Sequence, residues 1–496
     1  MKPLALSLLV AAIAAGSPSL GTIKVIHSNY SGSAHKPIVR KASVNAARQG
    51  NPVTSLTILY TSSARGQVRS CNCSKFRFGG YGRELTMLKS IRSKTADLLL
   101  LEGGDITGEN GFQSELKADV AARALKMLGY SAMTPGEEEL GLRGTKYIAR
   151  FKSTNVPIVC ANLSDSASDK LVFKPYTIVK TRNGLRVCII GLLDGSIGGP
   201  MLEKSMGCDV GDPVGALRPI IKNIRAKSDL VIVVYHGLAR DAKKLAAVNG
   251  VDFILTTHCG ESGVIFPSKG SNEVCAGVDK IGGVTVVDAR TKTNWSLGRI
   301  DLSLTSGKKI SSATHKLIYL DRSFIEAPEM VKIYDDYNEK VKDAVLNNSI
   351  SFKTKAETVL IKRGMDIQSM RTRLHKSAYA TSEKCKDCHS DVYENWSKTR
   401  HSHAMSTLVK VKQEYDPECV SCHATGASAR NGFVNVKETP ELANVQCEAC
   451  HGPGLQHMKS PSKGYGKCGE ETCRSCHTDE RTPNFDFDEA WEQIKH

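Results

Sequence analysis

Short apolar runs alternate with stretches of helical spacing between residues 54 and 304 of this chain. A run of about four to eight apolar residues bounded by turn signals is typical of a strand buried on both faces. The runs are LTILY (56–60), DLLLLEGGD (97–105), VPIVCANL (156–163), VCIIGLLD (187–194), DLVIVVYHG (229–237) and VDFILTTH (251–258). Helical spacing occurs near 82–95 and 115–128, and a strand-rich segment, 284–304, follows. Strands that alternate with helices predict an α/β domain with buried sheets, which we place at 54–312.

The pattern changes after this domain. Residues 325–346 have helical spacing, with Pro328 where a helix would begin, and a basic segment, 362–376, follows. We interpret 313–378 as a helical basic linker. The last region, 379–496, has few long apolar runs. A second domain there therefore needs something other than apolar side chains to fill its core.

The first residues, MKPLALSLLVAAIAAGSPS, combine a basic residue with an apolar run from Leu4 to Ala15 and small residues after it. That order is typical of a secretory signal peptide, which we place at 1–17, followed by a polar leader at 18–53. A membrane anchor is the alternative, but the run has about 12 residues where about 20 are needed to span a bilayer. We therefore expect an exported protein, periplasmic or extracellular, that is not transmembrane.

Four copies of one motif stand in the last region: CKDCH (385–389), CVSCH (419–423), CEACH (447–451) and CRSCH (473–477). C-x-x-C-H is the attachment signature of c-type haem, whose iron the adjacent histidine ligates. Pairs of C-x-x-C also bind zinc, but zinc does not require a histidine directly after each second cysteine. We predict four covalently bound c-type haems, and the attachment residues are Cys385, Cys388, Cys419, Cys422, Cys447, Cys450, Cys473 and Cys476.

The histidines of residues 379–496 match this haem count. The motifs supply four candidate proximal ligands, His389, His423, His451 and His477. The four others, which we predict as distal ligands, are His401, His403, His457 and His496. Four haems with two axial histidines each use this whole set, and iron with two histidine ligands favours electron transfer over ligand activation. A haem that keeps one position open for a small ligand is the alternative.

Five stretches of this region resemble the cytochrome c-554 family of multihaem cytochromes. They are CKDCHSDVYENW (385–396), TRHSHAMSTL (399–408), CVSCHATG (419–426), VQCEACHGPG (445–454) and CRSCHTDERTPNFDFDEAWEQIKH (473–496). The resemblance implies a mostly α domain in which closely packed haems form the core and an electron relay. It also implies distal ligands at the four histidines found by counting.

The region 54–305 resembles the metallophosphoesterase domain of the 5′-nucleotidase and UDP-sugar hydrolase family. Three stretches keep a residue that ligates metal in that family: GGD with Asp105, VVYHG with His236 and TTHCG with His258. The resemblance implies a four-layer α/β fold, with two stacked β-sheets flanked by helices, and a two-metal centre that activates water and holds phosphate.

Other family positions are changed. TSSARG (61–66) has Ser63 and Arg65 where the family has Asp and His, and Gly260 replaces a final His. The family's G-N-H-E is here GEEE (136–139). Two metals need a fuller ligand set, so we expect Asp105, His236 and His258 to serve hydrogen bonds. A single divalent ion is the alternative, with a carboxylate from Glu137, Glu138 or Glu139.

The loop after the first predicted strand contains a C-x-C pair, Cys71 and Cys73, with basic residues on both sides. Nearby cations lower the pKa of a thiol and make it reactive. The stretch resembles one found in exported, redox-associated relatives of the nucleotidases, so these two cysteines are candidate redox thiols for sulfur or thiol chemistry. A structural disulfide or two buried thiols are the alternatives.

Composition adds a limit on partners. The formal net charge is +16 and 41% of residues are hydrophobic. Haem propionates would reduce that charge, and an exported haem protein argues against nucleic acid as the partner. Acidic redox proteins or an anionic membrane surface fit better. The sequence therefore predicts an exported electron-transfer cytochrome whose degenerate phosphoesterase-like domain serves docking or thiol redox. A metal-dependent phosphoesterase or nucleotidase, or a haem-linked oxidoreductase, is the alternative.

Overall fold

The computed structural model describes most of the chain beyond residue 53. The described residues are 54–70, 78–108, 112–141, 144–197, 199–258, 271–289, 294–347, 378–427, 429, 431–478, 481–482 and 485–496. The predicted signal peptide and leader, Cys71 and Cys73, Gly260 and the basic segment 362–376 lie outside them. None of the helices within the described ranges is long and apolar enough to cross a bilayer.

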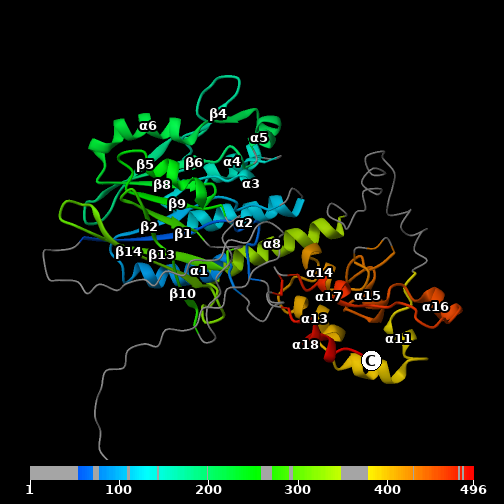
Figure 1. Cartoon of the computed structure of the whole chain (residues 1–496). Helices are drawn as coiled ribbons and strands as arrows, with labels where there is room; N and C mark the ends of the chain where they lie inside the picture. The colour runs from blue at the N-terminus through cyan, green and yellow to red at the C-terminus, as the bar shows by residue number, and fades with distance from the viewer. Residues whose placement is uncertain are drawn as a thin grey trace, which may run out of the picture.

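Two six-stranded sheets form the centre of the α/β domain (Figure 1). The first has the order β10-β14-β13-β1-β2-β3, and its strands are β1 (Thr54–Thr61), β2 (Leu98–Glu102), β3 (Ala132–Met133), β10 (Glu273–Ala276), β13 (Ser296–Leu304) and β14 (Ile310–Tyr319). The second has the order β11-β12-β9-β8-β6-β5, and its strands are β5 (Tyr176–Lys180), β6 (Arg186–Leu193), β8 (Leu230–His236), β9 (Phe253–Thr256), β11 (Asp279–Ile281) and β12 (Val284–Asp288). A two-stranded sheet pairs β4 (Leu163–Asp165) with β7 (Cys208–Val210).

Each large sheet contains a parallel set of strands. In the first sheet β1, β2 and β3 are parallel, and in the second β6, β8, β9 and β12 are parallel. Antiparallel strands extend both sets outward. The carboxyl ends of parallel strands lie along one edge of a sheet, which is where α/β proteins gather ligand-binding loops.

The layers follow from the side-chain pattern of the strands. In β1, Leu56, Ile58 and Tyr60 point into the core between the two sheets, while Leu59 points to the outer face of the first sheet. Alternate residues of a strand face opposite sides, so an apolar run fills both cores. Helices α1 (Tyr81–Arg92), α2 (Phe112–Leu128) and α8 (Pro328–Leu346) cover the first sheet. Helices α6 (Pro213–Ile224) and α7 (Ala242–Ala246) cover the second. The predicted four-layer arrangement is confirmed.

The linker and one strand differ from the sequence prediction. Strand β14 continues past residue 312, and α8, which begins at Pro328 as expected, packs Met330 and Ile333 into the core of the first sheet. Residues 313–346 therefore belong to the α/β domain. The run 156–163 forms only isolated bridges at Ile158 and Val159 before β4. Pro157 lacks an amide hydrogen, which interrupts strand pairing.

The C-terminal region is built from short helices, as predicted. They are α11 (Ser382–Cys385), α12 (Ser390–Ser397), η3 (His401–His403), α13 (Ala404–Val409), α14 (Pro417–His423), η4 (Pro440–Leu442), α15 (Cys447–His451), α16 (Leu455–Lys459), α17 (Glu470–Arg474) and α18 (Phe487–Glu492). A small apolar cluster that includes Leu408, Val420 and Phe433 holds α13 and α14 together.

The two domains touch through α2 and α8. Gln113 of α2 donates a hydrogen bond to Asp416, at the start of α14, over 2.6 Å. Lys117 of α2 forms an ion pair with Glu418 at 2.5 Å, and Asn338 of α8 donates to the Val411 carbonyl. Figure 1 shows α8 extending from the α/β domain toward these helices. The contact therefore centres on the helix that carries CVSCH.

Candidate functional site

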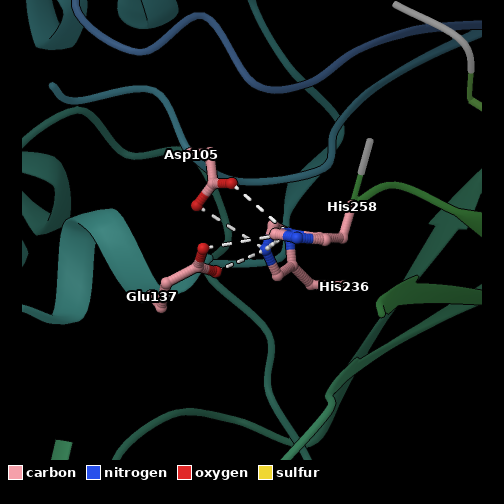
Figure 2. A group of neighbouring side chains, drawn as sticks. All are labelled: Asp105, Glu137, His236 and His258. Atoms are coloured by element: carbon pink, nitrogen blue, oxygen red, sulfur yellow. Dashed lines mark hydrogen bonds and ion pairs between the residues drawn. The ribbon is translucent and has the colours of Figure 1, made fainter. Parts of the chain in front are cut away.

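Four side chains converge where the carboxyl ends of both sheets meet (Figure 2). Asp105 follows β2 and Glu137 begins α3 (Glu137–Leu140), which follows β3 of the same sheet. His236 ends β8 and His258 follows β9, both in the second sheet. One ligand atom from each residue lies within 4.8 Å of the others. Two carboxylates and two imidazoles at this spacing are a donor set that suits a divalent transition metal ion.

The contacts within the group orient its donor atoms toward one another. His236 Nε2 lies 2.8 Å from Glu137 Oε2 and 3.6 Å from Asp105 Oδ1. His258 Nδ1 lies 3.6 Å from Asp105 Oδ2 and 3.3 Å from His236 Nε2. The other ring nitrogen of His236, Nδ1, lies 2.7 Å from the Gly103 carbonyl. A hydrogen bond from Nδ1 to a carbonyl fixes the tautomer and leaves Nε2 to bind metal.

The opposite charges of this largely buried group shift one another's pKa values. Burial alone would lower the pKa of His236, but Asp105 and Glu137 raise it to about 10. Burial alone would raise the pKa of Asp105, but His236, His258 and Arg65 hold it at about 2. Without an ion, the imidazolium supplies the positive charge that the two carboxylates require. A metal cation would displace that proton.

Glu139 holds the loop that presents Asp105. Its buried carboxylate accepts hydrogen bonds from the amides of Asp105 (2.9 Å), Thr107 (3.0 Å), Gly136 (2.8 Å) and Ile106. Burial, and then Asp105, raise the pKa of Glu139 to about 7. Asp105 itself has a left-handed backbone with φ 58°, a conformation that non-glycine residues adopt rarely and often at functional sites. Glu139 is thus a positioning residue, and Glu137 is the glutamate that joins the cluster.

The substituted family positions lie beside this group. The amide of Ser63 donates to the Gly104 carbonyl and the amide of Arg65 to the Asp105 carbonyl, each over 2.7 Å. The guanidinium Nη2 of Arg65 lies 3.9 Å from Asp105 Oδ2. Glu137 joins the three kept residues in a group that could hold one metal ion, so the single-ion alternative stands beside the hydrogen-bonding role that we expected.

The haem-attachment motifs form single helical turns. The amide of His389 donates to the Cys385 carbonyl at 2.9 Å, and the amide of His477 donates to that of Cys473 at 2.8 Å. Such a turn places both cysteines and the histidine of a motif on neighbouring positions. Helices α12, α16, α17 and α18 contain no buried residue of their own. Flat apolar groups packed between these helices would supply the core that the described side chains do not.

Three proximal imidazoles lie opposite distal ones. The ring centroids are 6.4 Å apart for His389 and His457, 6.2 Å for His401 and His477, and 5.6 Å for His451 and His496. Two imidazoles that each bind one metal ion at about 2 Å would have centroids about 6 Å apart. These distances therefore fit an iron between each pair.

The fourth proximal histidine, His423, has a backbone partner. Its Nδ1 lies 2.8 Å from the Ala404 carbonyl, which leaves Nε2 to face a haem. Burial lowers the pKa of His423 and of His477, so both rings favour the neutral form that ligates metal. His403 is exposed, and among the described residues no ring contact joins it to His423.

The predicted thiol site could not be placed, because Cys71 and Cys73 lie outside the described residues. Arg69 is the basic residue two positions before Cys71 in the sequence. Arg69 binds Glu326 with contacts of 2.7–3.2 Å and lies over the Tyr334 ring. The charge of Arg69 is therefore balanced by a carboxylate.

Comparison with known proteins agrees with the geometry of the C-terminal region. Residues 384–452 match the family described as cytochrome c554 and c-prime. The chain carries a cytochrome c554 domain. The chain is 32% identical over 130 residues to cytochrome c-554 of Nitrosomonas europaea, a match that covers 19% of this chain and 55% of that protein.

The domain in front of the cytochrome c554 domain is similar to 5′-nucleotidases. A 5′-nucleotidase of Vibrio cholerae is 30% identical over 189 residues, covering 36% of this chain and 33% of that protein. The chain thus spans about half the length, or less, of these two relatives. The crystal structure of a 5′-nucleotidase precursor from Thermus thermophilus superposes with a TM-score of 0.50 and 21% identity, over 58% of this chain and 59% of that one. The shared feature is the metallophosphoesterase-like fold.

Proposed function

We propose that this protein is an exported tetrahaem cytochrome that transfers electrons. The observation that carries the proposal is the set of three facing imidazole pairs, each of which includes the histidine of a C-x-x-C-H motif. The residues fit the groups: cysteines for attachment, histidines for ligation, and helices without buried residues to surround them. A c-type haem with two histidine ligands supplies one-electron transfer at an iron with no open position.

From these pairs we propose ligands for three of the four motifs. His457 would serve the haem of CKDCH, His496 that of CEACH and His401 that of CRSCH. For CVSCH, His423 supplies the proximal ligand, and His403 lies exposed rather than opposite it. This arrangement favours the alternative in which one haem keeps an open position.

The cysteines suggest the order of the relay. The Cys385 sulfur lies near that of Cys447, and the Cys422 sulfur lies near that of Cys476. The first motif thus adjoins the third, and the second adjoins the fourth. Groups attached at neighbouring sulfurs would lie close together, as an electron relay requires.

Export and the partner remain parts of the same proposal. Haem attachment outside the cytoplasm agrees with the predicted signal peptide, and the basic net charge of +16 favours an acidic redox protein as partner.

An anaerobic reductive titration tests the function. We expect the intact protein to take up four electrons per chain and to return them to an added oxidant. Uptake of two or fewer would refute the proposal.

A second function is favoured by one observation, the convergence of Asp105, Glu137, His236 and His258. We infer that this group binds a single divalent ion, which when bound would polarise an ester oxygen or a water molecule. The lost family ligands at Ser63 and Arg65 argue against the two-metal nucleotidase chemistry. Titration with Mn²⁺ should give one ion per chain for the protein and none for an Asp105→Asn, His236→Ala variant. Absence of binding in both would remove this function and leave the cytochrome proposal intact.

A further inference from the structure

We propose that Arg65 and the metal group together form a receptor for a tetrahedral oxoanion. In this receptor the Arg65 guanidinium takes the place of a second metal cation. The proposal rests on the single ion inferred above and adds the class of ligand. Arg65 stands where the family has a metal-binding histidine, and in this chain its guanidinium approaches Asp105.

Asp105 is the link between the two cationic positions. Its Oδ1 faces His236 Nε2 at 3.6 Å, while its Oδ2 lies between His258 Nδ1 at 3.6 Å and Arg65 Nη2 at 3.9 Å. Within the described residues, Oδ2 is fully buried and accepts no hydrogen bond. One carboxylate thus borders the metal group with one oxygen and approaches Arg65 with the other. This is the position from which a carboxylate would bridge two cations.

The backbone fixes Arg65 in this position. The amides of Ser63, Arg65 and Gly66 donate in turn to the carbonyls of Gly104, Asp105 and Ile106, over 2.7–2.8 Å. Ser63 and Arg65 have left-handed backbones with φ of 55° and 44°. Such conformations persist in non-glycine residues when the surrounding structure holds them, and they occur often at ligand sites. The loop after β1 is therefore tied to the loop that carries Asp105.

Arg65 is also accessible to a ligand. Its side chain is 43% exposed, whereas that of Asp105 is fully buried. At 3.9 Å, Arg65 Nη2 is too far from Asp105 for a hydrogen bond, so this contact is a weak Coulombic one. A role limited to pairing with Asp105 would bring the two groups closer, as in the 2.7 Å contact between Arg69 and Glu326.

The charge and the hydrogen-bond donors of Arg65 indicate which class of ligand the site would bind. Arg keeps its proton and has no lone pair to offer, so it cannot bind a metal ion, whereas the histidine expected at this position could. The two negative charges of Asp105 and Glu137 would neutralise one divalent ion. The Arg65 guanidinium would then give the metal-loaded site a net charge of +1, which favours an anion. The forked N–H donors of Arg match two oxygens of phosphate or sulfate. Ser63 adds a buried hydroxyl that has no hydrogen-bond partner among the described residues.

The test measures anion binding to the intact haem-loaded protein with one Mn²⁺ bound, by calorimetry, with inorganic phosphate and inorganic sulfate as separate probes. We expect at least one of these anions to bind, and the Arg65→Gln variant to bind it about tenfold more weakly or worse, because a charge-assisted hydrogen bond is lost. Arg65→Lys, which keeps the charge but not the fork, should fall between the two. The control is Arg182→Gln, in the turn between β5 and β6 at the opposite end of the second sheet; its anion affinity should equal that of the unchanged protein.

Mn²⁺ stoichiometry separates the possible failures. One ion per chain in Arg65→Gln shows that the metal group is intact, so equal anion affinity in this variant would overturn the receptor. Two ions in the unchanged protein would overturn the replacement of a second cation by Arg65. No ion in the unchanged protein would instead refute the metal site proposed above. Tighter binding of phosphate or of sulfate would show which of these two tetrahedral oxoanions the site prefers.

Discussion

Gln113 and Asp416 join the two domains across a buried hydrogen bond of 2.6 Å. Gln113 lies on α2 of the phosphoesterase-like domain, and its amide also contacts the Tyr337 hydroxyl of α8 at 2.9 Å. Asp416 caps α14 by accepting from the Glu418 amide at 2.9 Å. The same carboxylate therefore starts the helix of the CVSCH motif and anchors it to the neighbouring domain.

Replacing Gln113 by Leu should destabilise this junction. Asp416 would lose its donor from α2 while remaining buried, so the free energy of unfolding should fall by about 1–3 kcal/mol. Urea unfolding followed by haem absorbance measures the change. A matched control is Gln493→Leu, at an exposed glutamine after α18, which should leave the midpoint unchanged. Equal midpoints for Gln113→Leu and the original protein would mean that the domains are not coupled through this contact.

Two buried glutamates should make stability depend on pH. Burial raises the pKa of Glu84 to about 7 and that of Glu102 to about 8. Thr61 and Tyr130 connect them through hydrogen bonds of 2.5–2.7 Å. The folded state keeps protons that the unfolded chain releases near pH 4.3. The contribution of Glu84 and Glu102 to the free energy of unfolding should therefore be largest below about pH 4.3. It should fall as the pH rises to about 8, where both carboxyls ionise in the folded state.

A Glu84→Gln variant tests this dependence. It should reduce the slope of unfolding free energy against pH between 5 and 7 by up to about 1.4 kcal/mol per pH unit, because one proton no longer titrates. Glu102 and Glu139 would retain part of the slope. The control is Glu339→Gln, at an exposed position on α8, and an unchanged slope in Glu84→Gln would contradict the assignment.

Distal ligation can be tested one histidine at a time. His457→Ala should convert the haem of CKDCH from low-spin to high-spin ferric iron, because His389 loses the imidazole that faces it at 6.4 Å between centroids. His403→Ala should leave every low-spin signal in place. Electron paramagnetic resonance distinguishes the two states. A low-spin signal lost in His403→Ala but kept in His457→Ala would reverse the assignment.

Gly136 allows the metal group to be disturbed without removing a ligand. A Cβ at this position would collide with Asp105 Oδ1 and would lie 2.8 Å from His236 Cε1. Gly136→Ala should therefore displace Asp105 and weaken Mn²⁺ binding by about tenfold or more. Gly277→Ala is the control, since its Cβ would meet nothing within 4 Å. Unchanged Mn²⁺ affinity in Gly136→Ala would indicate that Asp105 is not a ligand.

Sequence patterns predicted most strands and three of the four residues in the metal group. Asp105, His236 and His258 each end or follow an apolar run, so their place at the edge of a sheet follows from the run itself. The sequence did not show which of Glu137, Glu138 and Glu139 would join these three residues. Glu139 turns toward backbone amides and Glu137 toward His236, a difference set by tertiary packing.

The pairing of distal histidines was also beyond the sequence. Counting showed that the supply matched four haems, but His389 and His457 meet only after several helices have folded between them. The run at 156–163 forms only isolated bridges at Ile158 and Val159, although its apolar pattern is like that of the buried strands. Local chemistry thus identified the candidate ligands, and long-range packing decided which of them come together.

The haem content of the purified protein tests the central claim most directly. Pyridine haemochrome analysis combined with iron and protein determination should give four c-type haems per chain. Most of the ferric signal should be low-spin, which corresponds to the three facing imidazole pairs. A count of two or fewer haems per chain would contradict the tetrahaem architecture and the electron relay that depends on it.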